Sequence, residues 1–290
     1  MQERHSARAD DDYTTAAGPP QRGRPGEAVP PLMAHALDAP TVFTPLALVE
    51  AVRAQRGRAE GPIPKVCVLD FDGDLTDELV RRGEVEPCAA WPCFHTEMWV
   101  WRQGKLSCGI IGRTIGGPYA VLVAEQMKVC GAQVIVGLAS AGRIGPSLPI
   151  PSLVVADSAI RDEGTSYHYL PPSPRVQAPR QLAKALEVQI ARAGLPVQRG
   201  LVWTTDAPYR ETTEQIARHA REGALAVEMQ AASLFAFAAR TGAQVGLVAQ
   251  VSNAPDHKGP AFDKGHPDVG RELLRAICTA AQGPASRRPG

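Results

Sequence analysis

Short apolar runs alternate with longer amphipathic stretches through the central part of the chain. The apolar runs are rich in Val, Ile and Leu and predict buried strands, over residues 65–71, 107–112, 132–140, 151–160, 198–206 and 243–253. The stretches between them have helical spacing and predict helices, over residues 43–57, 116–131, 179–194, 209–223, 229–242 and 264–282. Strands that alternate with helices favour an α/β fold with a largely parallel sheet.

The first predicted helix carries clear boundary signals. Thr44 is suited to cap its amino end, Pro45 to occupy its first turn, and Gly57 to end it. In an α/β fold, ligands collect at the carboxyl ends of the strands. We therefore expect the functional residues in the stretches that directly follow the predicted strands.

The two ends of the chain show no hydrophobic period. Residues 1–40 are rich in Pro, Gly, Arg and Asp and predict a disordered tail, and residues 283–290 read as a second tail. We therefore expect one folded domain over residues 41–282.

Composition narrows the class of protein. The 290 residues carry a formal net charge of +1, which gives no indication of nucleic acid or a membrane surface as partner. No apolar run approaches the roughly 20 residues that span a bilayer, and the amino-terminal stretch has no signal-peptide core. The six cysteines are scattered, which favours a reducing cytoplasm. Cys88, Cys93 and His95 lack a second ligand pair, so we expect no metal site.

Two glycine-rich turns follow predicted strands: GRTIGGP over 112–118 and ASAGRIG over 139–145. Glycines let the backbone approach a ligand, and the amino end of a helix favours an anion. The guanidinium of Arg113 can grip a phosphate or carboxylate, and Ser140 can donate to an anion. Each turn also fits a purely structural role. The candidate binding residues here are Arg113, Thr114, Gly116, Ser140, Ala141 and Gly142.

Two polar and aromatic stretches follow later strands: RDEGTSYHY over 161–169 and TTDAPYRE over 204–211. Such density after an apolar strand is typical of a functional loop. Tyr209 and Arg210 can form an apolar or stacking surface for a planar ligand, whereas Asp206 can simply cap a helix. The candidate binding residues from these stretches are Glu163, His168, Tyr209 and Arg210.

The stretch VEMQ, over 227–230, lies where an extended segment becomes helical. Glu228 and Gln230 at a spacing of two, with Met229 between them, suggest recognition of a polyol. An ordinary first helical turn fits the spacing equally well.

In this order, the stretches GRTIGGP, SAGRI, AIRDEGTSYHYLPP, TTDAPYRET, VEMQAASLF and VSN resemble the nucleoside phosphorylase family. That family includes uridine phosphorylase, hexameric purine nucleoside phosphorylase and methylthioadenosine nucleosidase. The resemblance covers roughly residues 42 to 280. It implies a single α/β domain whose central mixed sheet curls into a distorted barrel flanked by helices. It also implies assembly as a homodimer or homohexamer.

The resemblance implies cleavage of the N-glycosidic bond of a small-molecule nucleoside, with no metal or organic cofactor. The phosphorylases transfer the pentosyl group to inorganic phosphate, and the nucleosidases transfer it to water. The transition state is a ribosyl oxocarbenium ion, so the site should favour positive charge on the sugar.

Two positions that match the family motifs carry an amide in place of a carboxylate. Gln230 replaces the Glu that accepts from both ribose hydroxyls, and it therefore loses a charge-assisted hydrogen bond. Asn253 replaces the Asp with which the purine enzymes protonate the base. Because an amide can bind a keto oxygen but cannot act as an acid, the resemblance favours an oxo-base such as uracil or a 6-oxopurine.

The phosphate site departs further from the family pattern. The family reads Gly-Asp-Pro with a nearby Arg where this chain reads DFDGDLTD, and a second phosphate Arg has no counterpart in VIVGLAS. Ser140 matches the hydroxyl residue of the phosphate site. Asp72 or Asp74 is the candidate for orienting a water molecule. Three hypotheses stay open: phosphorolysis, hydrolysis, and a repurposed or non-catalytic nucleoside-binding protein.

Overall fold

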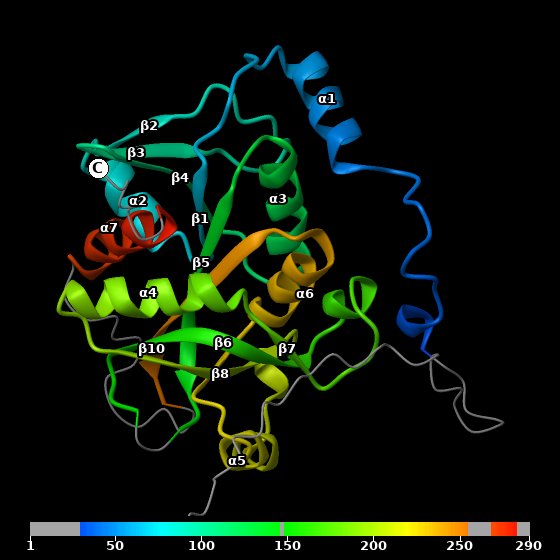
Figure 1. Cartoon of the computed structure of the whole chain (residues 1–290), viewed down its shortest axis with the longest axis vertical. Coiled ribbons are helices and arrows are strands. Elements are labelled where there is room, and N and C mark those ends of the chain that lie inside the picture. Colours follow the sequence, from blue (N-terminus) through cyan, green and yellow to red (C-terminus); the bar gives the residue numbers. More distant parts are fainter. Residues whose placement is uncertain (1–29, 146–147, 255–267, 283–290) are drawn as a thin grey trace, which may run out of the picture.

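The computed structural model describes residues 30–145, 148–254 and 268–282 as a single α/β domain (Figure 1). The strands of its mixed sheet are β1 Val66–Asp70, β2 Val85–Pro87, β3 Trp99–Gln103, β4 Leu106–Gly112, β5 Val134–Arg143, β6 Ser152–Asp162, β7 Arg175–Gln177, β8 Val197–Thr205, β9 Ala226–Glu228 and β10 Gln244–Asn253. The helices are α1 Pro45–Arg56, α2 Asp74–Arg81, α3 Gly117–Val129, α4 Arg180–Arg192, α5 Thr213–Arg221, α6 Ala231–Thr241 and α7 Val269–Ala281. Three short 3-10 turns are η1 Pro31–Met33, η2 Thr165–His168 and η3 Pro208–Arg210.

The sheet curls into a closed barrel. Its strand order is β10-β6-β8-β9-β5-β1-β4-β3-β2, and an additional pairing of β10 with β5 closes the ring. Parallel pairs join β4, β1, β5 and β10, and also β6, β8 and β9. Antiparallel pairs join β10 to β6 and β5 to β9, and they also build the β2–β3–β4 edge. The α/β fold with a distorted barrel, expected from the sequence, is confirmed.

Helices cover the barrel on opposite sides. In Figure 1, α4 and α7 pack against each other on one side, and α3 and α6 pack against each other on the other. The hydrophobic core fills the space between the sheet and these helices. None of the helices that the structure describes has the length and apolar character needed to cross a bilayer.

The boundary signals of the first helix are confirmed. Thr44 caps α1 by accepting from the backbone N–H of Ala47 at 3.2 Å, and Gly57 ends the helix with a φ of 57°. The helix predicted from residue 209 begins later, at Thr213. The reason is a capping box, in which Thr212 and Gln215 satisfy each other's backbone N–H groups.

Helix α2 arises from the acidic stretch DFDGDLTD, which the hydrophobic pattern did not predict to be helical. Asp74 and Asp77 lie in its first turn, where the helix dipole favours negative charge. Asp70 caps the same end: its Oδ2 accepts from both the N–H and the hydroxyl of Thr76, each at 2.8 Å. Much of this acidic cluster therefore serves to stabilise helix α2.

Residues 30–40, assigned to the tail from the sequence, contact the domain. His35 stacks on His168 with ring centroids 4.8 Å apart. Arg240 of α6 donates to the carbonyl of Leu37 at 2.8 Å and pairs with Asp38 at 2.9 Å. The remainder of the predicted amino-terminal tail, and residues 283–290, lie outside the described residues.

Candidate active site

Glu228 is the last residue of β9 and is only 3% exposed. Its Oε1 accepts from the Thr204 hydroxyl at 2.5 Å, and its Oε2 accepts from the backbone N–H groups of Gln230 and Ala231 at 2.6 and 2.9 Å. Burial raises the pKa of Glu228 to about 7, although these hydrogen bonds oppose the shift. The carboxylate thus satisfies the free N–H groups at the amino end of α6.

Gln230 is the N-cap residue of α6 and is also 3% exposed. Its side-chain Oε1 accepts from the backbone N–H of Met229 at 3.2 Å. The side chain is therefore folded back onto the turn between β9 and α6. Met229, between the two polar residues, is half-buried.

Three strand ends meet beside this turn. In the barrel register, Gly142 of β5 lies opposite Val227 of β9 and also opposite Asn253 of β10. A Cβ added to Gly142 would lie 3.1 Å from Val227 and 3.9 Å from the Asn253 amide nitrogen. The small residues Ser140, Ala141 and Gly142, Asn253, and the segment 228–230 therefore share one end of the barrel.

Asp72 lies at the same end of the sheet, after β1. The Ser140 hydroxyl donates a hydrogen bond to its Oδ2. The neighbouring Asp70 is 5% exposed, and burial raises its pKa. Asp70 is used by α2, whereas Asp72 is half-buried beside Ser140 and is the carboxylate closer to the candidate site.

The Arg113 side chain pairs with helix α2 in this structure. Its guanidinium forms a two-point ion pair with Asp77 of α2, with Nη1 at 2.9 Å from Oδ1. The two side chains are 64% and 54% exposed. Arg113 has a φ of 63°, and its side chain lies over Gly73, where an added Cβ would come within 2.8 Å of it. Arg113 therefore fastens α2 to the turn after β4.

Gly137, in the stretch VIVGLAS, has no room for a long side chain. A Cβ at this position would lie 2.7 Å from the ring of Phe71, which is 1% exposed. The aromatic ring thus fills the space between β1 and β5 beside Gly137.

A second buried carboxylate joins α6 to η2. Glu163 accepts through Oε2 from the N–H of Ser166 at 2.9 Å and from the hydroxyl of Ser233 at 2.5 Å. Its Oε1 has no hydrogen-bond partner among the described residues, and the same holds for the fully buried hydroxyl of Thr114. Ser233 also packs directly on Gly117, the first residue of α3, which follows the N-cap residue Gly116. The GRTIGGP turn and Glu163 therefore belong to one packed unit.

The buried side chain of Arg161 contacts many of the polar groups in and after the stretch RDEGTSYHY. It is 4% exposed and lies 4.4 Å over the ring of Tyr167. Its acceptors are the Ser166 and Ser173 hydroxyls and the carbonyls of Leu170 and Pro171. Burial lowers the pKa of Arg161. Much of this motif therefore serves to fold its own loop.

The structure does not bring every candidate to the strand ends. Tyr209 is 99% exposed in η3, and its neighbour Arg210 is exposed as well. His168 is exposed on η2 and lines a different feature, a groove of about 710 Å³. Thr165, Tyr169 and Asp206 line the same groove.

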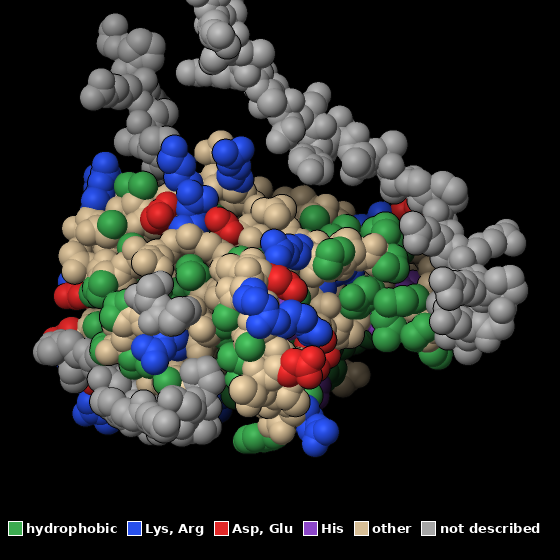
Figure 2. Space-filling view, turned by 90° about the horizontal axis from the view of Figure 1, so that it is seen from below, with side chains coloured by type: hydrophobic (Ala, Val, Ile, Leu, Met, Phe, Trp, Pro, Cys, Tyr) green, Lys and Arg blue, Asp and Glu red, His purple; other side chains and the backbone are tan. Residues whose placement is uncertain are grey.

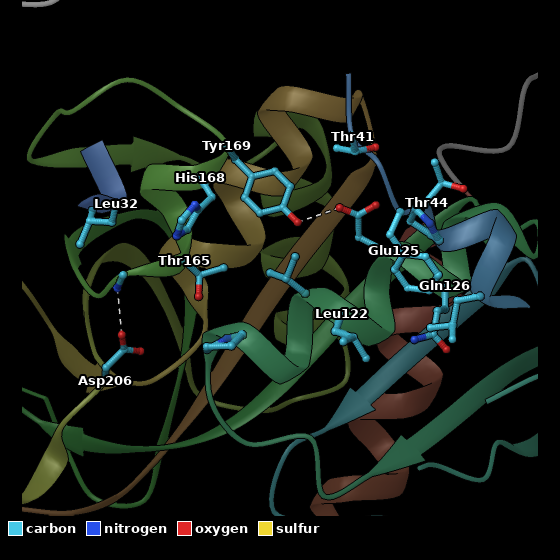
Figure 3. Close-up of a pocket in the computed structure, with 16 residues that line it drawn as sticks. Leu32, Thr41, Thr44, Leu122, Glu125, Gln126, Thr165, His168, Tyr169 and Asp206 are labelled. Carbon is cyan, nitrogen blue, oxygen red and sulfur yellow. Dashed lines mark hydrogen bonds between the residues drawn. The ribbon is translucent and has the colours of Figure 1, made fainter. Parts of the chain in front are cut away.

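This groove runs between the amino-terminal segment and α3, as Figure 3 shows. The Tyr169 hydroxyl donates to Glu125 at 2.7 Å across it, and the N–H of Gly164 donates to Asp206 at 2.8 Å. Leu32, Phe43 and Leu122 add apolar walls. Among the candidate residues, only His168 lines the groove, so it is a separate feature from the polar strand ends.

Three residues of the site were not singled out from the sequence. Thr204 is fully buried and binds Glu228, Ser233 binds Glu163, and Phe71 covers Gly137. Thr204 and Ser233 lie inside the quoted motifs TTDAPYRE and VEMQAASLF, so the motifs themselves were the available signal. Phe71 carries no such signal, because its contact depends on the pairing of β1 with β5.

Metal ligation has no support from the described residues, which include no group of three or more His, Cys, Asp or Glu side chains that could hold an ion. The backbone N–H of His95 lies 3.5 Å from Cys93 Sγ, and Cys88 is half-buried.

The structure is therefore a closed α/β barrel with helices on both sides, which has small residues, a buried carboxylate and two amides at one end. Residues 65–281 match the sequence model of the Phosphorylase superfamily. Because this match covers well over half of the chain, the protein belongs to that superfamily.

Individual relatives agree with this assignment. The guanosine phosphorylase of Halorubrum lacusprofundi is 29% identical over 171 residues, which is 56% of this chain and 69% of the relative. The uncharacterized protein R802 of Acanthamoeba polyphaga mimivirus is 28% identical over 127 residues, which is 44% of this chain but only 49% of that protein. The chain thus spans between half and about two thirds of the length of these relatives.

Among solved structures, the uridine phosphorylase of Vibrio fischeri ES114 superposes with a TM-score of 0.63 at 20% identity. The superposition covers 76% of this chain and 93% of the other. At this identity the likeness establishes the fold.

Proposed function

We propose that this protein cleaves the N-glycosidic bond of a nucleoside and transfers the pentosyl group to inorganic phosphate. The observation that carries the proposal is the segment Glu228–Gln230 beside Ser140, Gly142 and Asn253 at the end of the barrel. This arrangement occurs in a member of the phosphorylase superfamily. The named phosphorylases among its relatives support the same reaction class.

The chemistry needs negative charge near the sugar and hydrogen-bond donors near the leaving base. Glu228 supplies a buried carboxylate that is about half ionised at neutral pH, since its pKa is about 7. Its charge favours an oxocarbenium-like transition state. Asn253 can donate its amide N–H to a keto oxygen and so stabilise the base as it leaves. This pairing favours an oxo-base, uracil or a 6-oxopurine, over adenine.

Phosphate binding would draw on Ser140 and Arg113. Arg113 is paired with Asp77, but both side chains are more than half exposed, and such exposed ion pairs contribute little to stability. Turning the guanidinium from Asp77 to a bound phosphate therefore costs little. Thr114 adds a buried hydroxyl that has no hydrogen-bond partner among the described residues, shortly before the amino end of α3.

Hydrolysis is the second candidate reaction, and one specific observation favours it. Asp72 accepts from Ser140 at the position expected for phosphate, and a carboxylate there would repel an anion. The same carboxylate can orient a water molecule towards the sugar. The stretch VIVGLAS, which matches the strand that carries the family's second phosphate arginine, has no arginine to offset the negative charge.

A repurposed or non-catalytic nucleoside-binding protein is the third hypothesis. Gln230 and Asn253 lack the carboxylates of the family pattern, and this is the change expected when a pocket keeps a ligand but loses its reaction.

The test is a substrate panel of uridine, thymidine, inosine, guanosine and adenosine, incubated with and without phosphate. Base release that requires phosphate would support phosphorolysis, with oxo-bases preferred over adenine. Equal release in both buffers would instead establish a hydrolase. If no base is released while a nucleoside raises the melting temperature, the protein is a binder; a ligand at about 100 times its Kd adds about 2.7 kcal/mol of stability.

The remaining expectations form part of this proposal. We expect a homodimer or homohexamer that acts in the cytoplasm on a small molecule, with no nucleic acid, membrane or organic cofactor. All six cysteines are free thiols, five of them buried, which suits a reducing compartment.

A further inference from the structure

The segment 228–230 has almost no hydrogen-bond acceptor left for a ligand. Glu228, its one carboxylate, already receives three hydrogen bonds, from the Thr204 hydroxyl and from the N–H groups of Gln230 and Ala231. All three donors are buried with it. Because these bonds hold the amino end of α6, the carboxylate cannot turn towards a ligand without opening that end.

The Gln230 side chain can donate hydrogen bonds, whereas a carboxylate only accepts them. A backbone N–H can only donate, so the atom that faces the N–H of Met229 at 3.2 Å must be the carbonyl Oε1. This contact uses one of the two lone pairs of the side chain's single acceptor atom and holds that oxygen against the turn. What the side chain has left for another partner is chiefly its NH₂ group, which only donates.

A vicinal diol is held best by a carboxylate, which accepts from both hydroxyls at once. The segment offers donors in place of such an acceptor. One hydroxyl of a ribose can accept from the Gln230 amide, but the hydroxyl proton of its neighbour then faces only oxygen atoms that already accept hydrogen bonds within this segment. A buried donor without a partner weakens binding, whereas a sugar that lacks one of the two hydroxyls avoids the mismatch.

We infer that the site prefers 2′-deoxyribonucleosides to ribonucleosides and that Gln230 is the residue that sets this preference. The inference rests on the proposed function, since it assumes that the sugar meets the 228–230 segment. Glu163 is the rival acceptor: it is bound to Ser233, one turn further along α6, and its Oε1 has no partner among the described residues. If Glu163 took up the second hydroxyl, ribosides would be preferred.

The experiment compares kcat/KM for two matched pairs, uridine with 2′-deoxyuridine and inosine with 2′-deoxyinosine. For the wild type we expect the deoxyriboside to be favoured by about tenfold, the effect of one net hydrogen bond. Gln230→Glu restores a carboxylate and should move the ratio by at least about tenfold towards the riboside. Gln198→Glu, the same change at an exposed position at the other end of β8, is the control and should leave the ratio unchanged.

The outcomes separate the inference from the proposed function. A wild-type preference for ribosides overturns the inference and leaves the proposed function standing. If neither nucleoside is cleaved, thermal stabilisation decides: stronger stabilisation by 2′-deoxyuridine than by uridine supports the inference although the enzyme proposal fails. If neither nucleoside is cleaved and the deoxy member stabilises no more than its partner, both fail. The wild-type ratio is informative even if Gln230→Glu does not fold.

Discussion

A single buried carboxyl group, Glu228, gives the protein a measurable pH dependence. Its pKa is about 7 in the folded protein and near 4.5 in an unfolded chain. Because the folded state holds the proton more tightly, Glu228 makes its full contribution to stability below pH 4.5. That contribution is lost as the pH rises to 7, and the loss amounts to about 3 kcal/mol.

Glu228→Gln should remove this loss. We expect the free energy of unfolding of the wild type to fall between pH 5 and pH 8 by about 3 kcal/mol more than that of the variant. Urea unfolding at the two pH values measures the difference. Glu60→Gln, at an exposed position, is the control and should behave like the wild type. An equal fall in wild type and Glu228→Gln would mean that Glu228 keeps an ordinary pKa.

Arg113 is predicted to bind phosphate if the reaction is phosphorolysis. Arg113→Ala should raise the KM for phosphate by about ten- to a hundredfold, the value of one hydrogen bond to a charged group. Steady-state kinetics at varied phosphate concentration measure this effect. Arg81→Ala removes an exposed arginine from the same region, α2, and should leave the KM unchanged. An unchanged KM in Arg113→Ala would remove Arg113 from the anion site.

Asp72 distinguishes the two reaction hypotheses. If water is the nucleophile, Asp72→Asn should lower phosphate-independent base release by about 10²- to 10⁴-fold, as expected for a lost general base. Asp74→Asn tests the other candidate carboxylate and should have little effect, because Asp74 lies in the first turn of α2. Phosphate-dependent release that persists or improves in Asp72→Asn would instead indicate that the carboxylate only opposes phosphate.

At the scale of elements, β1 and β5 pack tightly where Phe71 meets Gly137, and no space is left for a larger side chain there. Gly137→Ala should destabilise the fold by about 1–3 kcal/mol, because its Cβ would meet the Phe71 ring at 2.7 Å. Adding Phe71→Leu should recover part of that loss by freeing space. Denaturant unfolding of the two single variants and the double variant gives the coupling between the positions. If the two changes simply add, the ring does not fill the space beside Gly137.

The sequence predicted the strands and helices with a strong hydrophobic period, and the caps at Thr44 and Gly57 were correct. It did not predict α2, because the stretch DLTDELVR is short and acidic, and its capping by Asp70 depends on the turn that follows β1. The short strands β2, β3 and β7 lie between turn residues, and their hydrophobic period is too short to detect. Local patterns indicate which segments form elements, and nonlocal packing decides the rest.

The candidate site shows the same limit. The motifs located Glu228, Gln230, Ser140 and Asn253, and the register of β5 with β9 and β10 brings these positions to one end of the barrel. The sequence did not indicate the hydrogen-bond partners of these residues. The Ser140–Asp72 contact, for example, joins residues that are 68 positions apart. Tyr209 was a candidate because of its aromatic ring, but its side chain is exposed. The sequence could not predict this, because a motif does not indicate which way a side chain faces.

At the scale of the whole molecule, apolar side chains remain exposed on neighbouring helices. Leu122 and Val129 lie seven residues apart on α3 and therefore on one face, and Leu46 is exposed on α1, which packs against α3. Figure 2, which views the molecule from below, shows a further gathering of hydrophobic side chains towards one end of the face in view, whereas acidic and basic ones are interspersed over the rest. The exposed apolar side chains of α1 and α3 suit the homo-oligomer that the family resemblance implies.

We therefore expect a native mass of two or six times 30.9 kDa. Leu122→Asp should lower it towards the mass of one chain, because a charge would be buried without a partner in the interface. Sedimentation velocity measures the mass. Val188→Asp places the same charge on α4, on the other side of the barrel, and should leave the assembly intact. A wild-type protein that sediments as a single chain would contradict the expectation.

The closing of the barrel by β5 and β10 has a consequence for how the chain is made. Translation delivers β5 about 110 residues before the end of β10. At a synthesis rate of about 5–20 residues per second, the edge of β5 that pairs with β10 stays unpaired for roughly 5 to 20 s. During that time the nascent chain carries an apolar strand with free N–H and C=O groups, the kind of edge that pairs with other chains. Slower decoding between these strands should therefore lengthen the interval in which the ribosome-bound chain needs protection by a chaperone.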